Sequence, residues 1–112
     1  MKTKDLKDSI KAALKLGGLV IAPRTSGKTR ALREILCEDP NAIVFTDNSV
    51  QKEHLIEKHP ALRKRVFINS RTSRTKIAWI DPLFKVYIDE YTPGNDYPNF
   101  FAAVTSRAKV LS

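Results

Sequence analysis

The sequence predicts a single-domain α/β protein with a mostly parallel sheet and helices on both faces. Short apolar runs typical of buried strands alternate with stretches in which apolar residues recur at helical spacing. This alternation favours right-handed crossovers, which make successive strands parallel and leave the helices outside the sheet. The 112 residues suffice for one core and leave no room for an accessory domain. No internal repeat or low-complexity tract interrupts the pattern.

The first half of the chain contains two predicted helix–strand units. Residues 5–16 should form an amphipathic packing helix with lysines on its outer side, which Gly17-Gly18 ends. A buried strand is expected at 19–22. A helix should follow at 29–37, with an apolar face made of Ala31, Leu32, Ile35 and Leu36.

Further elements continue the alternation. A turn at 39–41 leads to a second buried strand at 42–46. A helix is expected at 49–58, with Ser49 as its N-cap. The remaining predictions are a strand at 66–68, a loop at 69–75, a strand at 84–89, a flexible turn at 92–96, a helix from 97 or 98 to 108, and a final strand beginning at 109–112.

The segment from Ala22 to Thr29 reads Ala-Pro-Arg-Thr-Ser-Gly-Lys-Thr and matches the phosphate-binding P-loop pattern in every position but the first. In such a loop, backbone N–H groups ahead of a helix face the phosphates of a nucleotide. Ala22 replaces the first glycine, and we interpret the change as mild because alanine tolerates a negative φ. The expected nucleotide-binding residues are Pro23, Arg24, Thr25, Ser26, Gly27, Lys28, Thr29 and Arg30.

An acidic pair, Asp89-Glu90, stands at the carboxyl end of the apolar strand predicted at 84–89. Parallel sheets bind their ligands at the carboxyl ends of their strands, where these two side chains are expected. Taken alone, such a pair is equally well explained as the solvated start of a loop. Together with the P-loop it indicates a hydrolysis site.

In these two motifs the chain resembles the P-loop NTPases of the additional-strand catalytic-glutamate type, which include helicases and viral DNA-packaging motors. The resemblance covers nearly the whole chain in its order of strands and helices, and about a dozen residues carry it specifically. It implies an ATPase in which Lys28 contacts the phosphates, Thr29 and Asp89 hold Mg²⁺, and Glu90 is the general base. ATP is the default nucleotide, because no guanine-specific motif is present.

The resemblance also implies a sensor residue and a catalytic arginine. Ser112 lies near the place of the polar residue that ends the strand after the acidic pair. Arg107 matches, in position, an arginine supplied by a neighbouring subunit, which would require a dimer or ring. Arg24, Arg71 and Arg74 are other candidates, and a helix-capping role is the structural alternative for Arg107.

A formal net charge of +8 is concentrated in one stretch. Residues 61–76 contain six basic and no acidic residues, and the rest of the chain carries +2. Such a stretch favours a nucleic-acid backbone, DNA before RNA, as partner through counterion release. The alternative is a solvated basic face without a partner. The candidate nucleic-acid contacts are Arg63, Lys64, Arg65, Arg71, Arg74 and Lys76.

The leading hypothesis is therefore a small viral or mobile-element ATPase that couples hydrolysis to nucleic acid. The rival is a nucleotide-dependent binding module with little turnover, and a small-molecule kinase is a weaker third reading. Neither a membrane span nor a signal peptide is evident, which favours a cytoplasmic protein, in the host cytoplasm if viral. The chain is either a minimal domain or the truncated core of a larger protein.

Overall fold

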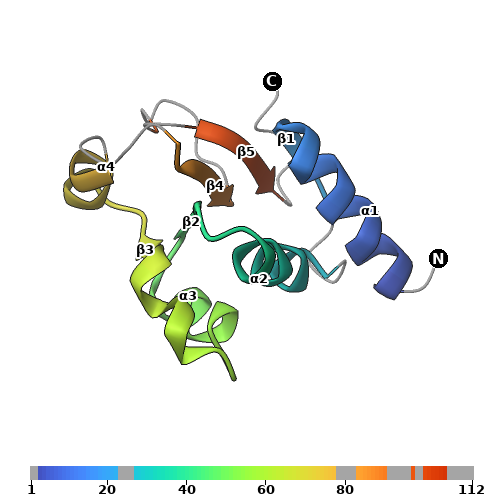
Figure 1. Ribbon diagram of the computed structural model, residues 1–112, viewed down its shortest axis with the longest axis horizontal. Coiled ribbons are helices and arrows are strands. Elements are labelled where there is room, and N and C mark those ends of the chain that lie inside the picture. The colour runs from blue at the N-terminus through green and yellow to red at the C-terminus, as the bar shows by residue number, and fades with distance from the viewer. Residues whose placement is uncertain (1–2, 23–26, 78–82, 91–96, 98–99, 106–112) are drawn as a thin grey trace.

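A fully parallel five-stranded sheet forms the centre of the molecule in the computed structural model, which describes residues 3–22, 27–77, 83–90, 97 and 100–105. The strand order is β1-β5-β4-β2-β3 (Figure 1). The strands are β1 (Gly18–Ile21), β2 (Ala42–Thr46), β3 (Val66–Ile68), β4 (Lys85–Asp89) and β5 (Phe100–Thr105). Each neighbouring pair is parallel, which confirms the predicted α/β class.

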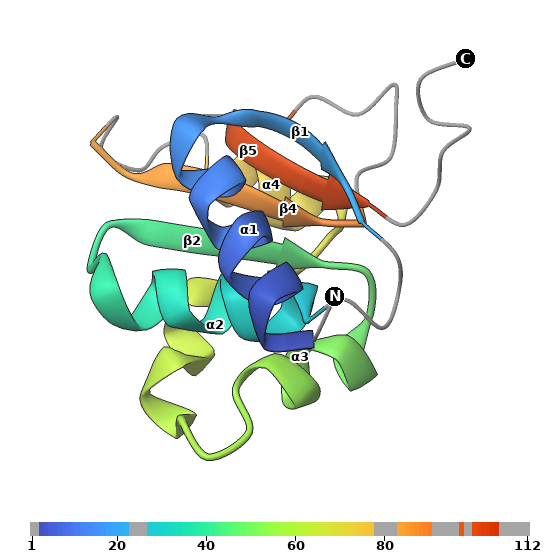
Figure 2. The same cartoon turned by 90° about the vertical axis from the view of Figure 1, so that its right-hand side faces the viewer.

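Helices cover the sheet. They are α1 (Thr3–Leu16), α2 (Lys28–Glu38), α3 (Ser49–Leu55), the short 3₁₀ helix η1 (Pro60–Arg65) and α4 (Arg71–Ile77). Figure 2 shows α1, α2 and α3 on one side of the sheet. The buried apolar residues of α2 are the four that were predicted, and they pack in one core cluster with Ile10 and Leu14 of α1. Ile77 of α4 belongs to a second cluster, with Phe45 and Ile88. The arrangement is compatible with a three-layer α/β/α fold.

The inner strands are buried on both faces, as a parallel sheet requires. All five residues of β2 are buried, and so are the last four residues of β4 and of β5. The carboxyl ends of β1, β5, β4 and β2 therefore meet at one edge of the sheet. This edge is where the predicted motifs lie.

Three lysines of α1 form ion pairs with two glutamates of α2. Lys7 and Lys11 contact Glu34, at 2.7 and 3.1 Å, and Lys11 and Lys15 contact Glu38. These contacts raise the pKa of Lys7 and Lys11 through hydrogen bonding to the carboxylates. The lysines that were predicted on the outer side of this helix thus connect α1 to α2 through ion pairs.

The predicted helix between 97 or 98 and 108 is wrong over Phe100–Thr105, which forms β5. Alanine favours helices, but Ala102 and Ala103 are fully buried between β1 and β4, where tertiary context outweighs that preference. The segments proposed at 92–96 and 109–112 lie outside the described residues.

Two smaller predictions are also corrected. The segment expected to be a loop at 69–75 contains most of α4, because Ser70 Oγ accepts a hydrogen bond from the Ser73 N–H at 3.1 Å and starts the helix. The N-cap of α3 is Asn48 rather than Ser49, and its Oδ1 accepts from the Gln51 N–H at 3.0 Å. That helix ends at Leu55, three residues before the predicted end.

Among the helices that the structure describes, none combines the length and the apolar character needed to span a membrane.

Candidate functional site

The beginning of α2 places the last residues of the predicted P-loop at the carboxyl edge of the sheet. Gly27 precedes the helix with a φ of +87°, in the left-handed region that glycine adopts without strain. A Cβ at Gly27 would lie 3.0 Å from Lys7 Cβ, so the position is also tight against α1. Ala22 is absent from the described residues with positive φ, consistent with a mild departure from the pattern. Residues 23–26, which include Arg24, lie outside the described residues.

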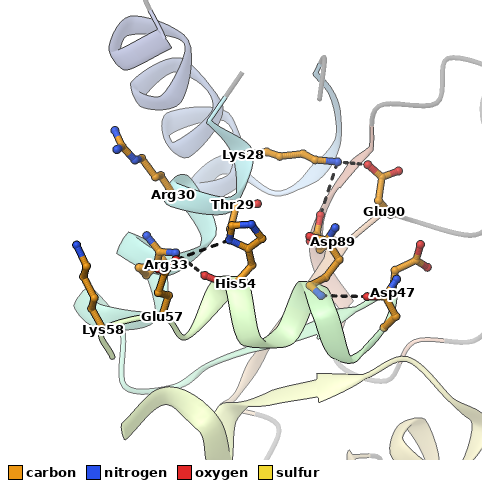
Figure 3. Close-up of a pocket in the computed structure, with 12 residues that line it drawn as sticks. Lys28, Thr29, Arg30, Arg33, Asp47, His54, Glu57, Lys58, Asp89 and Glu90 are labelled. Carbon is orange, nitrogen blue, oxygen red and sulfur yellow. Dashed lines mark hydrogen bonds and ion pairs between the residues drawn. The ribbon is translucent and has the colours of Figure 1, made fainter. Parts of the chain in front are cut away.

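Lys28 is the first residue of α2, and its side chain is 10% exposed. Its Nζ donates to Glu90 Oε1 in an ion pair and lies 3.8 Å from Asp89 Oδ1 (Figure 3). Because Lys28 and the acidic pair are far apart in the sequence, this meeting depends on the strand order. The structure therefore brings together the predicted phosphate-contacting lysine, metal ligand and base.

Asp89 ends β4 with a side chain that is 3% exposed. Its Oδ1 is buried and accepts no hydrogen bond in the structure. Burial raises the pKa of Asp89, an effect that Lys28 opposes and nearby Asp47 reinforces. A buried carboxylate oxygen without a donor, 3.8 Å from one cation, is suited to binding a further positive charge.

Mg²⁺ fits this donor set. Within the described part of the chain, no group of three or more His, Cys, Asp or Glu side chains could hold a metal ion. Magnesium in nucleotide sites needs no such cage, because it keeps several waters and binds one or two protein oxygens plus substrate phosphates. Thr29 and Asp89 line the same cavity, so the two predicted ligands are suitably grouped.

Glu90 adopts a backbone conformation that is rare for a residue with a side chain. Its φ is +61°, in the left-handed region, and its N–H donates to Val104 O at 2.9 Å. Besides the ion pair with Lys28, its Oε2 accepts a hydrogen bond from Thr105 Oγ1 at 3.2 Å. Such outliers persist where surrounding contacts hold them, often at functional sites.

Thr105 is a site residue that the sequence analysis missed. It ends β5, is fully buried, and directly contacts Glu90. Ser112 was the expected polar end of this strand, but the described strand that follows Asp89 is Phe100–Thr105. The alternative signal was present in the apolar run Phe-Phe-Ala-Ala-Val followed by threonine.

A cavity of about 710 Å³ begins at Lys28 and the acidic pair and continues between α2 and α3. Its far part also contains residues that were not predicted. Figure 3 shows that Arg33, His54, Glu57 and Lys58 lie there, away from Glu90. The cavity is lined by Lys28, Thr29, Arg30, Arg33, Asp47, Asn48, Gln51, His54, Glu57, Lys58, Asp89 and Glu90.

Arg33 has a structural role within this wall. Its Nε donates to Leu55 O at 2.7 Å and its Nη2 to His54 O at 2.6 Å. These carbonyls belong to the last turn of α3, where a cation is stabilising. Arg33 therefore joins α2 to α3 along one wall of the cavity.

The six basic residues of 61–76 do not form one group. Arg63 pairs with Glu53 at 2.8 Å, and Arg65 donates to the carbonyls of Asp39, Ala42 and Leu36 at 2.7–3.2 Å. Arg74 donates to Asn69 Oδ1. Lys64, Arg71 and Lys76 are exposed. The first three basic residues belong to η1, which precedes β3, and the last three belong to α4, which follows it. The two sets therefore lie at opposite ends of that strand.

Arg107 lies outside the described residues. Its expected position at the end of a helix after the acidic pair is not supported, because β5 occupies Phe100–Thr105. The structure describes a single chain, so an arginine from a neighbour stays a prediction.

Comparison with models of protein families, with curated proteins and with solved structures finds no match to this chain.

Proposed function

We propose that the chain binds Mg²⁺ and a nucleoside triphosphate, ATP by default, and hydrolyses it in a cycle coupled to nucleic acid. The observation that carries this proposal is the contact of Lys28 with both Asp89 and Glu90 at the carboxyl edge of a parallel sheet. Three groups of different chemistry meet at the start of a helix that follows a P-loop-like sequence. That combination suits phosphoryl transfer, which depends mainly on positioning and charge.

The strand order also supports the proposal. β5 lies between β1, which leads into the P-loop, and β4, which carries the acidic pair. A strand inserted at this position agrees with the additional-strand division of P-loop NTPases. The sequence resemblance and the topology therefore point in the same direction.

Each residue has a proposed part in the reaction. Lys28 holds the β- and γ-phosphates by charge, and Thr29 and Asp89 hold the metal ion, which offsets phosphate charge when bound. Glu90 orients the attacking water and accepts its proton. Thr105 positions the Glu90 carboxylate through its hydroxyl, as a sensor residue would.

Lys28 and Glu90 form an ion pair with each other in the structure. Nucleotide binding must therefore replace the glutamate with phosphate oxygens as the partner of Lys28. This exchange frees Glu90 for water, while its Thr105 contact keeps the carboxylate nearby. If Glu90 instead stays paired with Lys28 when nucleotide binds, turnover is slow, and the chain is the second candidate, a nucleotide-dependent binding module.

The coupling to nucleic acid is supported by the net charge of +8 and by the exposed basic residues Arg71 and Lys76 of α4. Phosphate backbones attract such charge by counterion release. The acidic pair is not available to oppose this attraction, because Asp89 is buried and Glu90 pairs with Lys28.

The test measures nucleotide binding and phosphate release by the purified chain with Mg²⁺ or EDTA, at low salt, with and without single-stranded DNA, duplex DNA and RNA. Lys28→Met should reduce turnover at least about 100-fold, because a charge that stabilises the transition state is lost. Lys64→Met, which removes an exposed lysine, is the matched control and should retain turnover.

The outcomes separate the candidates. Mg²⁺-dependent hydrolysis stimulated by nucleic acid supports the ATPase, and tight nucleotide binding without turnover supports the binding module. The absence of nucleotide binding at high protein and Mg²⁺ concentration would eliminate both.

A further inference from the structure

α4 contains two kinds of basic side chain. Arg71 and Lys76 are exposed, whereas Arg74 is half-buried. Arg74 Nη1 donates to Asn69 Oδ1 at 2.6 Å, and its guanidinium lies 5.8 Å from the centroid of the Tyr97 ring. The short helix therefore directs two cations to solvent and uses the third for an internal contact.

Asn69, Arg74 and Tyr97 form a connected group, which we call the clasp. Asn69 Nδ2 donates to Tyr97 Oη at 2.9 Å, so that one asparagine joins the other two side chains. The Asn69 N–H donates to Thr46 O at 2.7 Å, at the end of β2. The Tyr97 ring lies 6.1 Å from the Phe45 ring in the core. The clasp thus connects α4 to the edge of the sheet that carries the candidate site.

The clasp also contacts, through the core, the strand that carries the acidic pair. The Tyr97 ring packs against Phe45 of β2, and Phe45 is paired with Ile88 of β4, the residue before Asp89. A displacement of the clasp would therefore act on the end of β4, beside Asp89 and Glu90.

The exposed side of α4 is suited to phosphate oxygens. It presents the two cations together with the exposed residue Thr72, whereas the Thr75 hydroxyl donates to Arg71 O within the helix at 2.9 Å. The single apolar residue of α4, Ile77, is buried. A protein partner would usually need an apolar anchor at the centre of its contact, whereas a nucleic-acid backbone needs charge and hydrogen-bond donors.

We propose that α4 binds the backbone of a nucleic acid through Arg71 and Lys76, and that the clasp conveys this binding through Phe45 to the end of β4, beside Glu90. Arg74, Asn69 and Tyr97 are then positioning residues, and Arg74 is not a phosphate contact. The inference rests on the proposed function, in which Glu90 acts on water, and it adds the nucleic-acid contact and its route to the site.

The first experiment locates the contact with a fluorescein-labelled oligonucleotide and fluorescence anisotropy over a range of salt. The double variant Arg71→Ala/Lys76→Ala should bind about tenfold more weakly, with a salt slope shallower by about 1.5, because two phosphate contacts are lost. The matched control, Arg63→Ala/Lys64→Ala, removes the same charge from η1 and should bind nearly as the wild type does.

The second experiment tests the clasp with Arg74→Lys, which keeps the charge but loses the planar guanidinium. Oligonucleotide affinity should be retained, while the ratio of stimulated to basal ATP turnover should fall about fivefold or more. Asn69→Ser provides a second variant of the same connection. Thermal melting of each variant confirms that it is folded.

A third measurement does not need turnover. Addition of oligonucleotide, with a non-hydrolysable ATP analogue present, should slow amide hydrogen exchange at Asn69 and Glu90 of the wild type, whose N–H groups donate to Thr46 O and Val104 O, and leave it unchanged in Arg74→Lys. If the wild type hydrolyses no ATP but shows this protection, the proposed function fails and the inference stands.

Several results would overturn the inference while leaving the ATPase in place. One is an equal loss of affinity in the η1 control, and another is full stimulation of Arg74→Lys. A third is equally tight binding of poly-glutamate, which would indicate an acidic protein partner instead of nucleic acid.

Discussion

Lys28 and Glu90 stand 62 positions apart in the chain and form an ion pair, whereas six basic residues within 61–76 divide between the two ends of β3. Glu90 directly follows the end of β4, and Lys28 begins the helix that follows β1, so the parallel topology brings both to one edge of the sheet. The second set is close in sequence, but a strand separates its halves. Proximity in this fold is thus decided by strand order, and a cluster of charge in the sequence says little about a surface.

Glu90→Gln should have the largest effect, because it changes the site where Lys28, Asp89 and Glu90 meet. Turnover should fall about 100- to 10,000-fold, because the general base is lost. Nucleotide affinity should rise, since a neutral amide competes less with phosphate for Lys28. Single-turnover kinetics and equilibrium binding measure the two effects. Weaker binding together with slower turnover would contradict the proposed exchange of partners at Lys28.

Thr105→Val removes the hydroxyl that contacts Glu90 while it keeps the shape of the side chain. We expect turnover to fall about tenfold, the value of one hydrogen bond to a charged group, with little change in nucleotide affinity. The control is Thr46→Val, because Thr46 is an equally buried strand end whose hydroxyl donates to the carbonyls of Asn48 and Phe67. Equal losses in both variants would refute a specific role for Thr105.

Arg65→Ala tests the basic residues within 61–76, which do not form one group. The guanidinium bonds three carbonyls between α2 and β2, so its loss should lower the free energy of unfolding by about 1–3 kcal/mol. Arg63→Ala, which removes a surface ion pair with Glu53, should leave that free energy nearly unchanged. Urea unfolding compares the two variants. A reversed order would contradict the structural role given to Arg65.

Asp89→Asn should give the smallest effect, on stability without metal. Because burial raises the pKa of Asp89, the folded chain keeps that proton to higher pH than the unfolded chain does. Wild-type stability is therefore lost as the pH rises through the raised value, and the asparagine variant avoids this loss. The difference in melting temperature, measured in EDTA, should grow in favour of Asp89→Asn with increasing pH. A difference independent of pH would refute this account.

Much of the fold was predictable because buried strands and amphipathic helices have distinct periodicities. The strand at Ala42–Thr46 and the buried face of α2 were predicted residue for residue. β5 was not, because its two alanines favour a helix in isolation and only their burial between β1 and β4 explains the strand. The helix propensity of these alanines does not include the effect of pairing with β1, which lies about 80 positions away in the sequence.

The candidate site was predictable where a residue type implies its own chemistry. Lys28, Thr29, Asp89 and Glu90 belong to motifs with fixed spacing, and the structure brings all four to one cavity. Thr105, Arg33 and Tyr97 belong to no motif and act through contacts that tertiary structure creates. The same reason explains Arg65, whose charge suggested a ligand but whose partners are backbone carbonyls.

The place of β5 in the sheet has a consequence for how the chain folds during synthesis. Among the described strands, β1 pairs with β5, and Gly18 is matched with Ala102. While the ribosome has not yet released residues 100–105, the first strand therefore lacks its ladder, and the first helix and strand can join the rest mainly through α2. Closing such a long-range pair is slow and exposes strand edges meanwhile. We therefore expect a nascent chain to acquire its candidate site late and all at once, when the fifth strand inserts.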